Sequence, residues 1–193
     1  MFGDSVSSEL RKPSRRAFLL AAATTPQIFG NAAFASQGLT SDFWNQPRWV
    51  WLRRHRTNEE IRTVYWANGQ LIESEYERVC WFLRDRHINK AMYMSPVLLD
   101  VLYAQCGWAR YGGIDRPMIS TSGARFKQTN QRTEGAAKDS KHTSGEAHDG
   151  FFEGVQISVQ SQFAQWIGGG GVGFYPNKHF IHTDVGKVRY WRG

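Results

Sequence analysis

Apolar side chains alternate with polar ones in the first third of the chain, in a pattern that predicts paired strands. Residues 49–52 and 61–66 are rich in aromatic and β-branched side chains, which favour extended backbone. The Asn68-Gly69 pair that follows the second segment is a preferred tight turn. We therefore expect residues 49–52 and 61–66 to form a hairpin.

Two later segments have the spacing of amphipathic helices. In residues 74–85 the apolar side chains fall on one helical face, at Tyr76, Val79, Cys80 and Leu83. Ser74, with Glu77 three residues later, matches a capping box and predicts where this helix begins. Pro96 suits the first turn of a second helix, which we expect over residues 95–107.

The second half of the chain changes to short apolar runs between polar loops. Residues 118–122 and 180–185 are predicted strands, and residues 158–166 are predicted to be helical. Residues 151–160 fit either a strand or a helix. Helices followed by strands predict an α+β domain, with helices packed on a small, mainly antiparallel sheet.

The first 35 residues have the features of an export signal. Arg15 and Arg16 precede a short alanine-rich apolar stretch, which is typical of a twin-arginine signal, and Ala33-Phe34-Ala35 matches a signal-peptidase site. The alternative is an uncleaved anchor helix. We expect a signal over residues 1–35 cut after Ala35, a single catalytic domain over residues 36–193, a periplasmic location and no membrane span after cleavage.

The charge is mildly basic, with 24 Lys and Arg against 17 Asp and Glu and a formal net charge of +7. This balance suits work beside an anionic polymer. Nucleic acid is not expected as a partner, because no long basic block or nucleic-acid-binding motif is present. The oligomeric state cannot be predicted from these features.

The two cysteines, Cys80 and Cys106, lie in the two predicted helices, and their spacing is not that of a thiolate metal site. Buried free thiols and a disulfide are both compatible with the sequence, since spacing alone does not show whether the two residues come within bonding range.

The strongest chemical signal lies in residues 140–149 and 179–186. A catalytic zinc ion takes three imidazole or carboxylate ligands and keeps one position open, and His142, Asp149 and His182 can supply the three. Gly145 permits a turn between the first two of them, and Ala147 leaves space on the strand face of Asp149. Two neutral imidazoles and one carboxylate leave the ion positive, so that water can ionise near neutral pH.

The motif Ser-x-His-x-x-Gly-x-Ala-x-Asp at residues 140–149 resembles the zinc D-Ala-D-Ala carboxypeptidase and murein endopeptidase superfamily, which includes lysostaphin-like and hedgehog-fold domains. The chain is most similar to its branch of twin-arginine-exported murein endopeptidases. That branch is marked by Gly-x-Gly-x-Tyr-Pro, Phe-x-His-x-Asp-x-Gly and Val-Arg-x-Trp, found here at residues 171–176, 180–186 and 188–191. The Ser-Gly-Ala-Arg string at residues 122–125 and the Thr129-Asn130 pair also look like that branch.

The resemblance implies one zinc ion held by His142, Asp149 and His182, with Arg125 binding a substrate carbonyl or carboxylate near the metal. Relatives commonly carry an acidic general base three positions before the last ligand, where this chain has His179. Asp184 is the competitor for that role, or orients His182. We favour His179 as the base and Asp184 as the orienting group.

The implied function is hydrolysis of peptide cross-links or stem-peptide amides in bacterial peptidoglycan. Alternatives from the same sequence are a non-catalytic zinc or cell-wall binding domain and a D,D- or L,D-carboxypeptidase of the same superfamily. The choice between endopeptidase and carboxypeptidase stays open, because it depends on whether the cleft is closed at one end.

Overall fold

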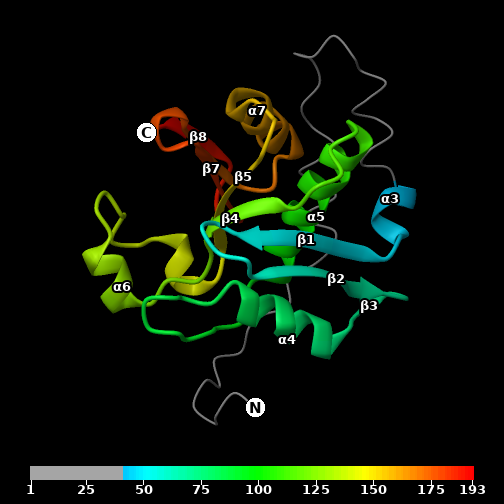
Figure 1. The fold of residues 1–193 in the computed structure, drawn as a ribbon, viewed down its shortest axis with the longest axis horizontal. Coiled ribbons are helices and arrows are strands. Elements are labelled where there is room, and N and C mark those ends of the chain that lie inside the picture. The colour runs from blue at the N-terminus through cyan, green and yellow to red at the C-terminus, as the bar shows by residue number, and fades with distance from the viewer. Residues whose placement is uncertain (1–40) are drawn as a thin grey trace.

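The computed structural model describes residues 41–193 (Figure 1). The expected export signal over residues 1–35 lies outside this range. Among the described residues, none of the helices combines the length and the apolar character that crossing a membrane requires.

The helices and strands follow one another in mixed order along the chain. The α-helices are α3 (Ser41–Asn45), α4 (Glu73–Phe82), α5 (Pro96–Tyr111), α6 (Lys127–Arg132) and α7 (Ile157–Ile167), and the short 3-10 helices are η1 (Lys141–Ser144) and η2 (Pro176–Lys178). The strands are β1 (Arg48–Arg54), β2 (Glu60–Ala67), β3 (Gln70–Leu71), β4 (Met118–Ser122), β5 (Ala147–Phe152), β6 (Gly171–Tyr175), β7 (Phe180–Asp184) and β8 (Arg189–Arg192).

All the strands within residues 41–193 belong to one 8-stranded sheet in the order β3-β2-β1-β4-β5-β7-β6-β8. The pairs β1–β4 and β6–β8 are parallel, and the other neighbours are antiparallel. The α+β class and the mainly antiparallel sheet are therefore confirmed, and the sheet is larger than expected. The sequence did not predict β8, because three of its four side chains are exposed and the apolar alternation of a half-buried strand is missing.

The expected hairpin and both long helices are present. The strands β1 and β2 pair in antiparallel fashion, and α5 begins at Pro96. The predicted capping box is wrong: α4 begins at Glu73 after Ile72, without a side-chain cap. The backbone N–H of Ile72 instead donates to the carbonyl of Tyr65 at 2.9 Å, so the chain passes directly from the sheet into the helix and Ser74 already lies in its first turn.

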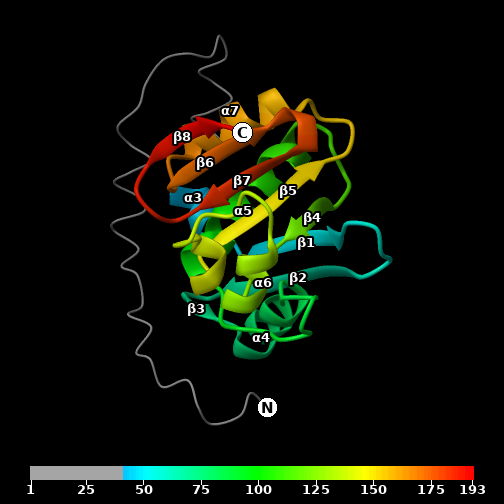
Figure 2. The same ribbon diagram turned by 90° about the vertical axis from the view of Figure 1, so that its left-hand side faces the viewer.

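The sheet has a covered face and a second face that carries the chemistry. The α7 side chains Ile157 and Ala164 pack with Val172 and Ile181 of the sheet in one buried cluster. Figure 2 shows α5 behind β5 and β7, and α6 on the viewer's side of the sheet, in front of β1 and β2. Since neighbouring residues of a strand point to opposite faces, β7 turns Ile181 toward α7 and His182 toward the other side.

Both cysteines are buried and free in this structure. The Sγ atom of Cys80 accepts the backbone N–H of Met94 at 3.3 Å, and Cys106 is buried beneath β1. Of the two states that the sequence allowed, the structure has the free thiols. They are part of the core beneath the sheet.

Candidate active site

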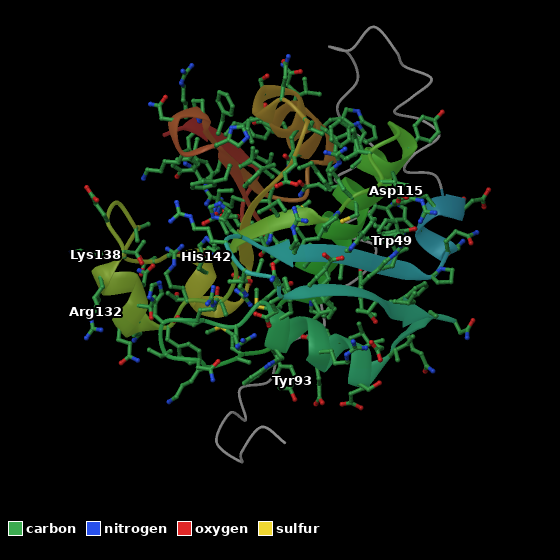
Figure 3. The ribbon with its side chains drawn as sticks, in the orientation of Figure 1. Trp49, Tyr93, Asp115, Arg132, Lys138 and His142 are labelled. Carbon is green, nitrogen blue, oxygen red and sulfur yellow. The ribbon has the colours of Figure 1, made fainter. Side chains whose placement is uncertain are left out.

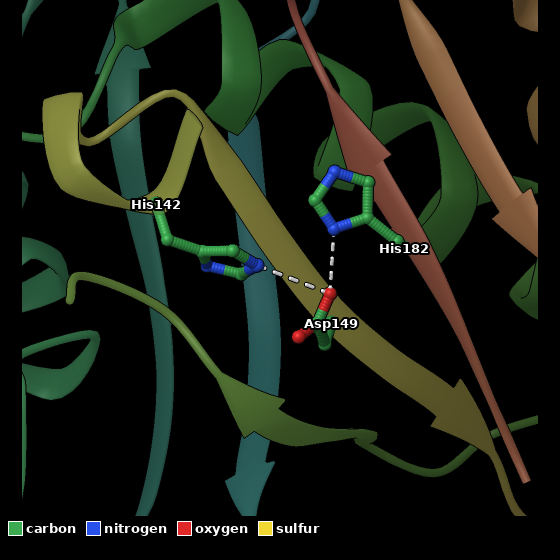
Figure 4. Close-up of side chains that lie close together, drawn as sticks. All are labelled: His142, Asp149 and His182. Atoms are coloured by element: carbon green, nitrogen blue, oxygen red, sulfur yellow. Dashed lines mark hydrogen bonds and ion pairs between the residues drawn. The ribbon is translucent and has the colours of Figure 1, made fainter. Parts of the chain in front are cut away.

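Three residues from three elements meet on the face of the sheet that faces α6. His142 comes from η1, Asp149 from β5 and His182 from β7, and each offers a ligand atom within 4.8 Å of the other two (Figure 4). Asp149 Oδ1 lies 3.2 Å from His142 Nε2 and 2.8 Å from His182 Nδ1. The structure thus brings together the three residues that the sequence proposed as metal ligands.

Local backbone geometry explains why these segments converge. Asp149 and His182 are direct partners in the antiparallel β5–β7 ladder, so their side chains project from the same face. Gly145 ends η1 with φ +70°, a left-handed conformation that glycine adopts without strain. A Cβ there would lie 2.4 Å from the carbonyl oxygen of Tyr93. The turn that the sequence assigned to Gly145 is therefore required both by its dihedral angle and by this close contact.

The orientation of the His142 ring is set by a backbone carbonyl. Its Nδ1 lies 2.6 Å from the carbonyl oxygen of Gly123. A carbonyl only accepts, so Nδ1 carries the proton and the neutral ring has its lone pair on Nε2. Figure 3 shows His142 inside the molecule, with the exposed Arg132 and Lys138 farther out on the same side. The buried imidazole is therefore prepared to bind a cation through Nε2.

His182 lies between two carboxylates. Its Nδ1 faces Asp149, and its Nε2 donates to Asp184 Oδ2 at 3.1 Å. The Asp184 side chain is completely buried and also accepts hydrogen bonds from the backbone N–H groups of Gly171 and Gly186 and from the guanidinium of Arg189. With Nε2 engaged by Asp184, the ring directs Nδ1 toward Asp149 and His142.

These contacts shift the pKa values strongly. Burial alone lowers the pKa of His182, but the hydrogen bonds to Asp149 and Asp184 outweigh it and raise the pKa to about 9. Burial raises the pKa of both carboxyl groups, and their imidazole and guanidinium partners reverse this and hold each pKa well below its usual range. A cation bound at His182 Nδ1 would take the place of a proton on that nitrogen, so metal binding is expected to release protons.

Arg125 lies at the edge of the same cluster. Its Nη2 is 3.6 Å from Asp149 Oδ2 and donates to Ser122 Oγ at 3.0 Å. Its Nη1 donates to the side-chain oxygen of Asn130 at 3.4 Å. The backbone N–H of Arg125 donates to the carbonyl of His142, which ties this segment to η1. Arg125 therefore places a positive charge next to the three residues.

His179 is placed differently from the other predicted residues. It is exposed at the end of η2, in a left-handed conformation, and its ring packs edge-on against Phe151 with centroids 5.0 Å apart. Phe151 is two positions along β5 from Asp149 and so lies on the same side of the strand. The neighbouring His148 points to the opposite side, where its Nε2 hydrogen-bonds with Ser120 Oγ and burial lowers its pKa to about 3.

Sequence reasoning missed several groups that support the site. The Gly123 carbonyl has no side-chain signal, and Arg189 was noted only as part of a motif. The ring centroids of Trp191 and His182 lie 5.3 Å apart, and Trp191 Nε1 donates a hydrogen bond to the hydroxyl of Tyr175 at 2.9 Å. A Cβ on Gly173 would lie 2.6 Å from the Trp191 ring, so the glycine pattern before Tyr175 was the available signal for this contact.

The residues fit a zinc ion in donor type and in orientation. Two imidazoles and one carboxylate are the ligands of a catalytic zinc site, and each imidazole has its second nitrogen engaged by an oxygen acceptor, as metal-binding histidines do. Gly145 permits the close approach of the Tyr93 backbone to the turn that carries His142. The three residues could therefore hold one divalent cation.

Comparison with known proteins identifies the family. The family described as "Peptidoglycan L,D-endopeptidase MepK" matches residues 43–191. The protein of that name from Escherichia coli K12 is 35% identical over 150 residues, which are 76% of this chain and 81% of that protein. "Probable peptidoglycan L,D-endopeptidase MepK" from Haemophilus influenzae is 28% identical over 152 residues, or 77% of this chain and 81% of that protein. No solved structure gave a significant match. Since the match spans most of the chain, this protein belongs to the family of the peptidoglycan L,D-endopeptidase MepK.

Proposed function

We propose that this protein is a zinc-dependent peptidoglycan endopeptidase that hydrolyses L,D-type peptide cross-links. The observation that carries the proposal is the convergence of His142 Nε2, Asp149 Oδ1 and His182 Nδ1 within 4.8 Å, with the second nitrogen of each ring held by an oxygen. The names of the relatives supply the substrate class, and their activity is extended here to this chain.

In the proposed reaction, water adds to the carbonyl carbon of the cross-link amide, the C–N bond breaks, and a proton moves to the departing amine. A zinc ion held by the three residues would supply Lewis acidity, which lowers the pKa of water and polarises the amide carbonyl. Arg125 would stabilise the negative charge that develops on the carbonyl oxygen, because its guanidinium borders the cluster.

The proton-transfer roles remain those expected from the sequence. We propose His179 as the general base, because it stands three positions before His182 and its exposed imidazole has a ring nitrogen that can accept a proton. Asp184 is proposed as a positioning residue: it is fully buried and both of its oxygens already accept hydrogen bonds, so that it keeps the Nε2 proton of His182 in place.

The site of action follows from the same proposal. Peptidoglycan lies outside the inner membrane, and we propose that residues 1–35 are a twin-arginine signal that takes the protein to the periplasm. The murein peptides are then the partner, and the basic charge suits their acidic groups.

Digestion of purified murein tests the function directly. The protein without residues 1–35 is incubated with murein before and after chelation, and the released muropeptides are separated and identified. We expect products of cross-link cleavage that disappear with chelator, return with added zinc, and are absent for His142→Ala. Binding to murein without any product would instead support a non-catalytic cell-wall domain, and release of a single terminal residue would support a carboxypeptidase.

A further inference from the structure

A basic cleft adjoins the three-residue cluster on the side of Arg125. It encloses ≈ 530 Å³ between the end of β1, the loop after α4 and the segment that leads into α6. The loop after α4 and the segment that leads into α6 lie side by side at the left of Figure 1. Two hydrogen bonds join them: the backbone N–H of Ala124 donates to the carbonyl of Leu83, and that of Phe126 donates to the carboxylate of Asp85. The lining of the cleft includes four arginines, Arg54, Arg84, Arg86 and Arg125.

Acidic groups neutralise only part of this charge. Glu59 is shared, since it pairs with Arg54 at 2.9 Å and with Arg84 at 2.7 Å. Asp85 also lines the cleft and offsets one further charge, while its two oxygens accept the backbone N–H groups of His87 and Phe126, so four arginines face two carboxylates. Arg86 is exposed and makes no ion pair within residues 41–193. The cleft therefore keeps an excess of positive charge.

Arg54 provides an independent sign that an anion belongs here. Its side chain is only 6% exposed, and its Nη2 is buried without a hydrogen-bond partner in the described part of the chain. Burial lowers the pKa of this guanidinium, and the charges of Arg84 and Arg86 lower it further against the effect of Glu59. A buried cation with an unmet donor costs free energy, so a nearby anion would stabilise it.

We propose that this cleft binds a carboxylate of the cross-linked peptide, on the residue whose amine forms the scissile amide. Arg84 and Arg86 would present the donors, and Arg54 would add its charge from the floor of the cleft. A guanidinium matches a carboxylate in shape and can donate two parallel hydrogen bonds to it.

The position of the cleft explains the choice of ligand. When the amine of the amide stands on a carbon atom that also bears a carboxyl group, that carboxyl group lies close to the bond that is cut. Arg125 belongs both to the cleft and to the edge of the metal-ligand cluster, 3.6 Å from Asp149. The inference rests on the proposed function for the identity of the substrate, and it adds the group that the enzyme recognises.

The test compares two synthetic cross-linked peptides that differ only in this group, a free carboxylate or a carboxamide. We expect wild-type protein with zinc to cleave the carboxylate peptide with a kcat/KM about 10-fold higher or more, because hydrogen bonds between charged groups are lost with the amide. Arg86→Gln should lower kcat/KM for the carboxylate peptide by a larger factor than for the carboxamide peptide, so that the preference for the carboxylate is reduced. Arg78→Gln removes an exposed charge on α4 and should change neither rate.

The outcomes separate this inference from the proposed function. Equal cleavage of the two peptides, or an equal loss on both with Arg86→Gln, overturns the carboxylate site and leaves the endopeptidase in place. Cleavage of neither peptide overturns the endopeptidase. In that case the binding of the same two peptides is measured by titration of tryptophan fluorescence. Tighter binding of the carboxylate peptide, with the difference lost in Arg86→Gln, supports the carboxylate site, and equal binding of both peptides overturns it.

Discussion

Replacing Asp184 with asparagine tests whether this residue positions His182 or acts as the base itself. The carboxylate is completely buried, and one oxygen serves His182 and Arg189 while the other serves the backbone N–H groups of Gly171 and Gly186 and a second Arg189 nitrogen. An asparagine has a single acceptor oxygen. If that oxygen keeps the two backbone donors, its NH₂ group faces His182 Nε2, which must then give up its proton or turn away.

The magnitude follows from that geometry. Loss of a group that orients a ligand histidine weakens metal binding by about 10- to 100-fold, which corresponds to about 1.4–2.7 kcal/mol. An unmatched buried donor should also lower the free energy of unfolding by about 1–3 kcal/mol. Arg189→Gln is the matched control: it removes the other charged partner of Asp184, but its side chain is 47% exposed, so we expect a smaller loss of zinc affinity.

The assay combines zinc competition with a chromophoric chelator and muropeptide release at increasing zinc. A positioning role predicts that saturating zinc restores most of the rate of Asp184→Asn. A folded Asp184→Asn protein with wild-type zinc affinity would refute the reasoning. If zinc affinity falls but saturating zinc leaves kcat down by about 100-fold or more, Asp184 is the base, and His179→Ala should then retain activity.

Three further outcomes are expected. Leu102→Ala, at a completely buried core position, should lower the free energy of unfolding by about 2–5 kcal/mol in a urea titration, and a change below about 0.5 kcal/mol would contradict the core assignment. Burial raises the pKa of Cys80 to about 11 and of Cys106 to about 12, so at pH 8 both remain thiols and should react with iodoacetamide only after unfolding. Rapid labelling of folded protein, followed by mass spectrometry, would contradict their burial. Gly145→Ala would place a Cβ in a left-handed backbone conformation, 2.4 Å from the carbonyl oxygen of Tyr93. The strain should weaken zinc binding and lower the melting temperature. An unchanged zinc affinity together with an unchanged melting temperature would contradict the strain at this turn.

Much of the candidate site could be anticipated because its signals are local. Extended backbone places alternate residues on one face, so the sequence predicted that His182 and Asp184 would project together, and they are hydrogen-bonded in the structure. The need for a turn at Gly145 is likewise a property of a few neighbouring residues. The apolar periods of α4 and α5 followed from the same kind of spacing, although the start of α4 did not, because the strand that precedes it decides where the helix begins.

What the sequence by itself determined was which residue types share a strand or helix face, because that depends only on the repeat of the backbone. The tertiary structure alone decided that Asp149 pairs with His182, 33 residues away, because strand register depends on burial across the whole sheet. It also decided that the carbonyl of Gly123 orients His142 and that arginines from three separate segments line one cleft. Along the chain those arginines are indistinguishable from ordinary solvated charges, and only the packing of distant segments gives them a common environment.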